Sequence, residues 1–328
     1  MKWDAQGSQC AYIYWPRLRA QKAIRLGAWS LVAAGVAAPV LRKRVKLPKG
    51  PVITSAALAP VALQVVLPPS KLRSAATVGL QMWAYLAAYE MPYDDPQELE
   101  ARVHVDYPVT IDRFLGFGRL PSQRLQKWFA RPGKINPHER VLVFCHWVWF
   151  AVPHGTVAYV LFRHPEKFPS AAARIYGVFD AGAVFYWVVP TAPPWYAAKL
   201  GRVGGEDDLP VRRMMLEYGE EFWGERWGEL YDVLGGNPLA AMPSLHFATS
   251  LMAARVLAET GPIAGAIGWT YASTLGLALV YLGEHYAVDL IAGAALTEGV
   301  RRVAGPLSRP ARALTSGLDA LRGLATDG

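Results

Sequence analysis

The apolar segments of this chain restrict its fold first, because several are long enough to cross a lipid bilayer. Six strong segments lie at about 73–91, 141–162, 171–193, 244–260, 263–283 and 286–304, and two weaker ones lie at 23–41 and 51–68. A helix rises about 1.5 Å per residue, so about 20 apolar residues cross the hydrocarbon layer once. Hydrophobic residues make up 52% of the 328 and charged residues only 18%. We therefore predict an all-α, polytopic membrane protein built on a six-helix bundle.

The basic residues beside these segments predict the orientation of the bundle. If the six segments alternate, the Lys and Arg residues at 71–73, 163–174 and 301–312 fall on one side. The positive-inside rule assigns that side to the cytoplasm. The loops 92–140 and 194–243 then lie on the extracytoplasmic side of a multi-pass cell-membrane protein.

The N-terminal residues do not fit a simple alternation. Basic residues at 42–49 and at 71–73 both favour the cytoplasm, although segment 51–68 lies between them. This proline-rich segment either crosses the membrane, re-enters it or lies at its surface. We predict three parts: an N-terminal membrane-associated extension over 1–70, a six-helix membrane domain over 71–305, and a cytoplasmic tail over 306–328.

Two histidines bracket a predicted helical hairpin. His246 opens one apolar segment, and His285 precedes another, 39 positions later in the chain. The residues between them form two apolar runs with a break at Gly261-Pro262. The chain crosses the membrane, turns and returns, so both imidazoles are expected on the same face. Ionisable side chains at such a position are costly and mark a functional site by default.

The residues around these histidines suit phosphorus chemistry. Asp289 lies four positions after His285 on one helix face, where it can accept the Nδ1 proton and leave Nε2 as a nucleophile or base. Ser244 stands at a helix start, where backbone N–H groups and the helix dipole favour an anion, and His246 can donate a proton to a leaving oxygen. Each motif alone also fits an ordinary hydrogen-bonded pair or a capped helix start. Together they favour catalysis.

Other functional classes fit less well. The net charge of +8 arises from basic residues beside apolar segments, so we expect no nucleic-acid partner. Cys10 and Cys145 are too few and too distant for a disulfide framework or a zinc site. A site in which His246, His285 and Asp289 bind zinc is a remaining alternative, but the serine at a helix start favours an anion, so we expect no metal and no cofactor.

The strings PSLHFA (243–248) and EHYAVDLIAGA (284–294) resemble the second and third signature motifs of the type 2 phosphatidic acid phosphatase superfamily. They are most similar to the inositol phosphorylceramide synthase branch, as is VPTAPPW (189–195). The resemblance covers about residues 73–305. It implies a six-helix bundle without a metal, in which His285 forms a phosphohistidine, Asp289 orients it and His246 is the general acid.

The basic residues of the family motifs are largely missing. The first motif, a lysine followed after six residues by Arg-Pro, is represented in the expected region only by Lys199 and Arg202. The third motif usually has an arginine six residues before its histidine, where this chain has Leu279. We expect Ser244, Lys199 and Arg202 to bind phosphate, with the arginines of the first outer loop as weaker candidates. A phosphodiester carries less charge than a monoester, so the loss favours transfer over simple hydrolysis.

These features predict an integral membrane phosphotransferase or phosphatase that acts on a lipid phosphate or phospho-headgroup at the outer leaflet. The lipid bilayer and a lipid phosphate are the expected partners, with a polyol or another alcohol as a possible acceptor. The alternatives are a plain phosphatase for phosphatidate or a polyprenyl pyrophosphate, and a catalytically inactive lipid-binding or transport relative.

Some further features have weaker interpretations. The pattern of residues 211–234 predicts an amphipathic helix that either covers the site as a lid or packs on the surface. Leu314, Leu318 and Leu321 indicate a short surface helix near the C-terminus. Four ionisable residues fall within the predicted spans, and interhelical packing is their expected role: His146, His154, Asp180 and Arg255.

Overall fold

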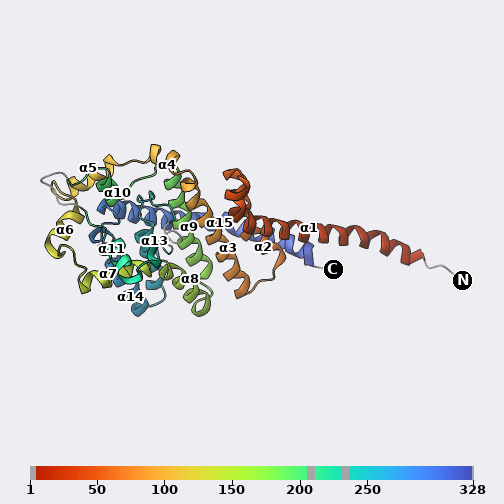
Figure 1. Ribbon diagram of the computed structural model, residues 1–328. Coiled ribbons are helices and arrows are strands. Elements are labelled where there is room, and N and C mark those ends of the chain that lie inside the picture. Colours follow the sequence, from red (N-terminus) through yellow and green to blue (C-terminus); the bar gives the residue numbers. More distant parts are fainter. Residues whose placement is uncertain (1–4, 205–210, 229, 231–235, 327–328) are drawn as a thin grey trace. The chain divides into compact units, whose positions relative to one another are not determined.

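The computed structural model describes residues 5–204, 211–228, 230 and 236–326. The helices (Figure 1) are, in chain order, α1 (Ala5–Val45), α2 (Lys49–Val66), α3 (Lys71–Glu90), α4 (Pro96–Arg102), α5 (Asp106–Leu115), α6 (Pro121–Phe129), α7 (Pro137–Trp147), α8 (Ala151–Arg163), α9 (Phe168–Val188), α10 (Pro194–Lys199), α11 (Met214–Trp223), α13 (Leu245–Ala258), α14 (Pro262–Tyr281) and α15 (Ala287–Thr326). A short 3₁₀ helix, Met91–Asp94, follows α3. No strand forms among the described residues beyond isolated β-bridges. The predicted all-α class is confirmed.

Three described helices are long and apolar enough to cross a membrane: Arg19–Leu41 within α1, α2 and α14. Helices α7 and α8 together also qualify, but they are bent by 53°. The segment predicted as one span over 141–162 is therefore built from two helices that meet at a bend, and not from one straight helix. Pro153 explains the break, because its ring excludes the carbonyl of Trp149 one turn earlier and it has no N–H to donate. The count of six spanning helices remains a prediction.

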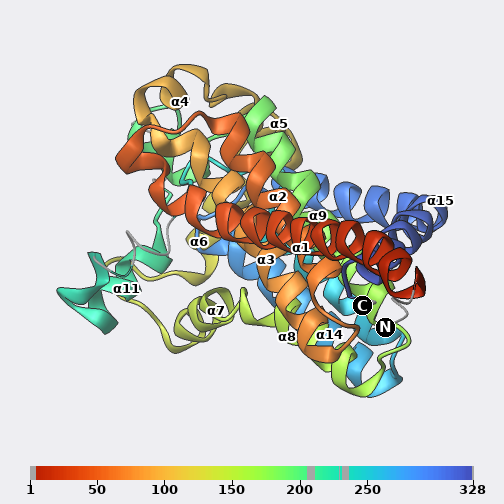
Figure 2. The ribbon, with the colours of Figure 1, turned by 90° about the vertical axis from the view of Figure 1, so that its right-hand side faces the viewer.

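The chain divides into two compact units, which we describe separately. The first comprises Met1–Ala88 and Gly305–Gly328. In it α1 and α2 run side by side (Figure 2), and a Cβ on Gly35 would lie only 2.5 Å from the Ser55 carbonyl oxygen. That close approach of two backbones requires glycine. Helix α2 is unbroken through Pro60.

The second unit, Tyr89–Ala304, contains both histidine motifs. Helices α13 and α14 form the predicted hairpin, with Gly265 and Gly268 packed against Ala258 and Ala254 of α13. The turn between them begins at Gly261, and Pro262 occupies the first turn of α14, where its missing N–H costs nothing. The hairpin therefore forms where the sequence predicts it.

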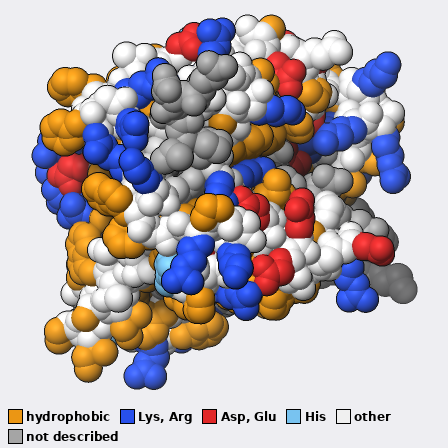
Figure 3. Space-filling view, turned by 60° about the vertical axis from the view of Figure 1, so that its left-hand side comes forward, with side chains coloured by type: hydrophobic (Ala, Val, Ile, Leu, Met, Phe, Trp, Pro, Cys, Tyr) orange, Lys and Arg blue, Asp and Glu red, His pale blue; other side chains and the backbone are white. Residues whose placement is uncertain are grey.

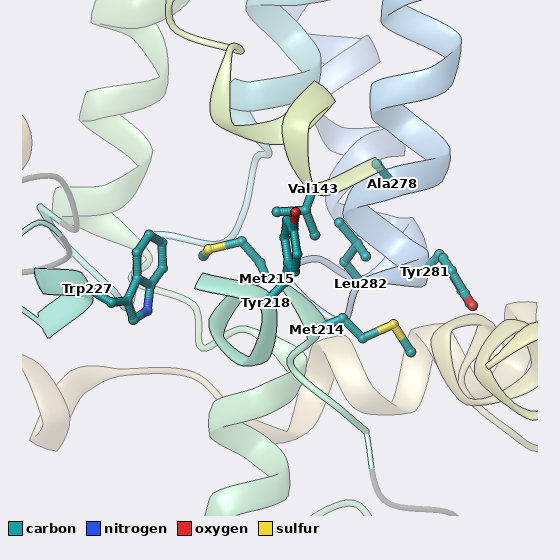
Figure 4. Close-up of a cluster of buried hydrophobic side chains, with 8 residues drawn as sticks. All are labelled: Val143, Met214, Met215, Tyr218, Trp227, Ala278, Tyr281 and Leu282. Carbon is teal, nitrogen blue, oxygen red and sulfur yellow. The ribbon is translucent and has the colours of Figure 1, made fainter. Parts of the chain in front are cut away.

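A buried apolar cluster closes one end of this hairpin (Figure 4). It joins the end of α14 to α7 and α11 through eight side chains: Val143, Met214, Met215, Tyr218, Trp227, Ala278, Tyr281 and Leu282. Helix α11 buries Met214, Met215 and Tyr218 here, whereas Trp223 at its end is exposed. The predicted continuous helix over 211–234 is wrong, however, because α11 ends at Gly224, whose φ of +56° leaves the helical region. Within that range, residues 229 and 231–234 lie outside the described part of the chain.

Helix α15 is longer than the predicted span over 286–304. It continues without interruption through Pro306 and Pro310 to Thr326. The leucines that indicated a separate short C-terminal helix therefore belong to the last turns of α15. One helix therefore runs from the His285 motif to the end of the described residues.

Candidate functional site

His285 lies in the tight turn between α14 and α15. The backbone N–H groups of Glu284 and His285 both donate to the carbonyl of Leu279, at 3.1 and 3.0 Å. Gly283 has a φ of +82°, and a Cβ there would lie 2.4 Å from the Arg212 carbonyl oxygen. Only glycine fits that conformation at that distance. The turn places the His285 side chain in a buried position.

Asp289 orients the His285 ring from the first turn of α15. Its Oδ2 lies 3.0 Å from His285 Nδ1 and also accepts the N–H of Tyr286 at 2.9 Å. Asp289 is fully buried. A carboxylate in this position accepts a proton from Nδ1 and so directs the lone pair of Nε2 away from itself. The predicted i, i+4 pairing is present in the structure.

His246, at the start of the hairpin, lies beside His285, which follows the end of the hairpin. The Nδ1 atom of His246 lies 3.2 Å from Nε2 of His285. Because Nε2 carries the lone pair when Asp289 holds the other nitrogen, the hydrogen bond runs from His246 Nδ1–H to His285 Nε2. The hairpin thus brings the two imidazoles together, as its length predicts. Their catalytic roles remain predictions.

Ser244 joins the two helix starts that carry these residues. Its hydroxyl caps α13 by accepting the N–H of Phe247 at 3.4 Å, and its own N–H donates to the Asp289 carbonyl at 3.0 Å. Gly293 permits this approach, because a Cβ there would lie 2.8 Å from the Ser244 carbonyl oxygen. The serine predicted to seat a phosphate therefore also ties α13 to α15.

Two aromatic side chains from the bend between α7 and α8 surround His246. The rings of His146 and Trp149 lie 4.9 and 4.2 Å from the His246 ring, centroid to centroid. Trp149 is held in place because its Nε1–H donates to Thr249 Oγ1 at 3.1 Å. His146 therefore belongs to the surroundings of the site, in addition to packing between helices as predicted.

The VPTAPPW segment supports the loop that precedes α13. Thr191 forms isolated β-bridges with His104 and with Ala240. Tyr107 OH lies 2.8 Å from Thr191 Oγ1, and Tyr186 OH donates to the Pro243 carbonyl at 2.8 Å. These contacts hold the backbone on which Ser244 and His246 are mounted.

Asp112 is a residue of the site that the sequence reasoning missed. It lies on α5, is fully buried, and its two oxygens accept the N–H groups of Ala287 and Val288 at 3.1 and 2.9 Å. It thereby caps α15 two residues after His285. Burial raises the pKa of Asp112 to about 6, although the two backbone hydrogen bonds lower it. An available signal was an acid on the buried face of an amphipathic helix, beside Pro108 and Val109.

Arg213 is a second residue that the sequence reasoning missed. Its guanidinium pairs with the Glu284 carboxylate through bonds of 3.0 and 3.2 Å and lies 4.0 Å above the Trp195 ring. Both charged side chains are largely buried. The Arg213 guanidinium is thus held beside Glu284, the residue immediately before His285. Trp195 of the VPTAPPW motif forms one wall of that position.

The predicted phosphate ligands Lys199 and Arg202 are not brought to the histidines. Both are exposed at the end of α10, where Arg202 Nε lies 3.7 Å from Asp106 Oδ1. Within the described ranges, no hydrogen bond or ion pair links either side chain to His246 or His285. Short helices in a loop position their side chains through tertiary contacts, which the motif spacing does not encode.

The other ionisable residues of the predicted spans pack between or along helices. His154 Nδ1 lies 3.2 Å from Tyr176 OH, and its ring stacks on Phe179. Arg255 lies 3.7 Å from Glu298 across α13 and α15. Asp180 is exposed on α9. For His154 and Arg255 the predicted interhelical role is present.

The donor atoms of the site do not converge on a common point. His285 directs one nitrogen at Asp289 and the other at His246, so the three side chains face one another in a row. In the part of the chain that the structure describes, no group of three or more His, Cys, Asp or Glu side chains is arranged to hold a metal ion. The alternative zinc site therefore gains no support from this geometry.

Comparison with known proteins agrees with this arrangement. The family model described as the PAP2 superfamily matches residues 109–300, more than half of the chain. The match includes both histidine motifs and Asp112. No curated protein and no solved structure matches. The chain is a membrane protein of helical architecture and belongs to the PAP2 superfamily.

Proposed function

We propose that this protein is an integral membrane phosphotransferase or phosphatase that cleaves a lipid phosphate or phospho-headgroup through a phosphohistidine on His285. The observation that carries the proposal is the row of contacts Asp289–His285–His246, at 3.0 and 3.2 Å. A carboxylate, a nucleophile and a proton donor follow one another in this row, in the order that acyl and phosphoryl transfer require.

In the first step, the lone pair of His285 Nε2 attacks phosphorus and forms an N–P bond. The P–O bond to the leaving group breaks, and the leaving oxygen takes the Nδ1 proton of His246, which acts as an imidazolium and becomes a neutral imidazole. Asp289 stabilises the positive charge that develops on His285. In the second step, water or an alcohol gives its proton to His246 while its oxygen attacks phosphorus, and the N–P bond breaks.

The transferred phosphoryl group has to lie between the two histidines, so their nitrogens must be farther apart during the reaction. A reacting nucleophile lies roughly 3–3.5 Å from phosphorus, and the proton donor lies about 2.6–3.2 Å from the leaving oxygen beyond it. The nitrogens would then be on the order of 6 Å apart, against 3.2 Å in this structure. Substrate binding is therefore expected to break the direct contact and to move the two imidazoles apart.

Arg213 is better placed than Lys199 or Arg202 to meet the phosphate charge, because its ion pair with Glu284 adjoins His285. That pair is electrically balanced, and Leu279 replaces the family arginine with a buried apolar side chain. A site with so little uncompensated positive charge suits a singly charged phosphodiester better than a doubly charged monoester. We infer that the reaction is transfer of a phospho-headgroup to an alcohol, as in inositolphosphotransferases, with the site facing the outside of the cell membrane.

The test is incubation of purified protein in nanodiscs with phospholipids radiolabelled in the phosphate. Phosphatidylinositol, phosphatidate and a polyprenyl pyrophosphate would each be offered with and without a polyol. We expect an acid-labile, base-stable label on the protein that is absent from the His285→Ala variant and present in a His164→Gln control, whose histidine is on the α8–α9 turn. A labelled His285→Ala variant would contradict the assignment of the nucleophile.

Acceptor dependence separates the two reactions. A transferase forms a labelled alcohol product only when the polyol is present, whereas a phosphatase releases inorganic phosphate without it. Absence of label and of turnover with every lipid would favour a non-catalytic lipid-binding protein.

A further inference from the structure

Helices α5 and α6 and the turn between them carry four large exposed aromatic side chains in the second unit. Phe114, Phe117, Trp128 and Phe129 are 82%, 89%, 65% and 58% exposed. Neither helix is long enough to cross a membrane. Large aromatic side chains that gather on a surface mark an interaction site, whereas isolated ones need no explanation.

The turn between the two helices holds one of these side chains outward against a backbone preference. Phe117 has a φ of +54°, which is unusual for a residue other than glycine. Arg124 supports the turn by donating to the carbonyls of Gly116 and Phe117. A Cβ on Gly116 would lie 1.9 Å from the Arg119 carbonyl oxygen, so the turn is also closely packed. Strain of this kind is retained where it presents a side chain for a purpose.

The position of these helices relative to the membrane follows from two buried side chains. Gln126 of α6 donates to the carbonyl of Tyr281, the last residue of the spanning helix α14, at 2.8 Å. Asp112 of α5 binds the first residues of α15. Both helices therefore stand at the level where α14 leaves the bilayer, which is the level of the headgroups.

The segment that contains α5 and α6 is strongly basic. Residues 106–134 contain six Lys and Arg against two acids, and one of these acids is the buried Asp112. A space-filling view shows hydrophobic side chains next to Lys and Arg side chains on one face of the molecule (Figure 3). Aromatic side chains interspersed with basic ones are typical of segments that bind the interface of anionic membranes.

We propose that this aromatic–basic surface, formed by Phe114, Phe117, Trp128 and Phe129 with Arg113, Arg119, Lys127, Arg131 and Lys134, binds anionic phospholipids at the membrane face on which His285 lies. The aromatic rings enter the headgroup layer, and the basic side chains contact lipid phosphates. The inference does not depend on the catalytic proposal. Lipid binding at this surface would nevertheless connect membrane composition to the site, because α5 also carries Asp112, which binds the start of α15.

The test places a nitroxide label on Phe117→Cys in a background with Cys10→Ser and Cys145→Ser. The full-length protein is reconstituted in phosphatidylcholine vesicles with and without phosphatidylglycerol. Collision with oxygen, which concentrates in lipid, is compared with collision with a water-soluble nickel chelate. A label on Gln97→Cys of α4, an exposed polar position of the same loop, is the control, and Trp128→Cys provides a second reporter.

We expect the label at position 117 to be several-fold less accessible to the nickel chelate than the label at position 97 when phosphatidylglycerol is present. Charge reversal at Arg119 and Lys127 should restore its accessibility. Equal accessibility at positions 117 and 97 would overturn the proposal, as would immersion that does not depend on phosphatidylglycerol. Dipolar broadening that disappears on dilution with unlabelled protein would assign the surface to a second copy of the chain instead.

Discussion

Replacement of Asp112 by asparagine tests how helix α5 supports the His285 turn. Burial raises the pKa of Asp112 to about 6, against 3.8 for an unperturbed aspartate. The folded protein therefore binds more protons than the unfolded chain between these two values. The contribution of Asp112 to the stability of the fold is fully present below a pH of about 4 and is lost as the pH rises through about 6.

The expected size follows from the same shift. A difference of about 2 pKa units corresponds to roughly 3 kcal/mol of unfolding free energy. For a domain of this size that is a decrease of about 6–12 °C in the unfolding temperature between acidic and neutral pH. The Asp112→Asn variant has no titrating group there, so its profile should lack this decrease. At neutral pH its lost hydrogen bond costs about 1–3 kcal/mol and largely offsets the relief of the buried charge.

Activity at neutral pH should fall, although the stability there is nearly unchanged. Asparagine has one acceptor oxygen for two N–H groups, so the start of α15 loses one of its two supports. Displacement of His285 by about 1 Å is expected to lower kcat by up to about 100-fold. The assay combines thermal unfolding in detergent over pH 4–8 with turnover at neutral pH.

The matched control is Asp106→Asn, which removes an exposed carboxylate from the same helix. It should keep the wild-type slope of stability with pH and shift stability by no more than about 0.5 kcal/mol. If the Asp112→Asn variant shows the wild-type slope and wild-type turnover, Asp112 is not the titrating cap of α15 and the reasoning is wrong.

Two further substitutions test the neighbouring turn. Gly283→Ala should destabilise the fold by about 1–3 kcal/mol, because alanine is strained at a φ of +82° and its Cβ would meet the Arg212 carbonyl; Gly299→Ala, in open space on α15, should not, and equal unfolding temperatures would contradict this. Tyr281→Phe should cost about 1–3 kcal/mol, because it removes the 2.6 Å hydrogen bond to the fully buried Glu139 carboxylate. An unchanged unfolding temperature in detergent would contradict this.

The fold could be predicted where its signals are local. The Gly261-Pro262 break and the lengths of the apolar runs predicted the α13–α14 hairpin, which forms as Leu245–Ala258 and Pro262–Tyr281. The bend before Pro153 could not be predicted in the same way. A proline in a membrane helix is tolerated when neighbouring groups satisfy the freed carbonyl, so the outcome depends on packing.

The candidate site likewise contains contacts that the sequence predicts and residues that it misplaces. His285 and Asp289 are close in sequence and do pair, but His285 lies in the turn before α15 and not on the helix face that the i, i+4 spacing predicted. The distance from His246 to His285 follows from the length of a hairpin. Lys199 and Arg202 were placed from motif spacing in a loop, where no regular geometry applies, and they lie away from the histidines.

The sequence by itself determined the helical class, the membrane character and the residues that meet at the end of the hairpin, because segment length and helical period act over short stretches of chain. Only the tertiary structure decided how that meeting point is held. Asp112 reaches the start of α15 across 175 positions, and Arg213 reaches Glu284 across 71. Such contacts form when loops fold back on helix ends whose backbone N–H groups and charges need partners, and this need is visible only once the helices are in place.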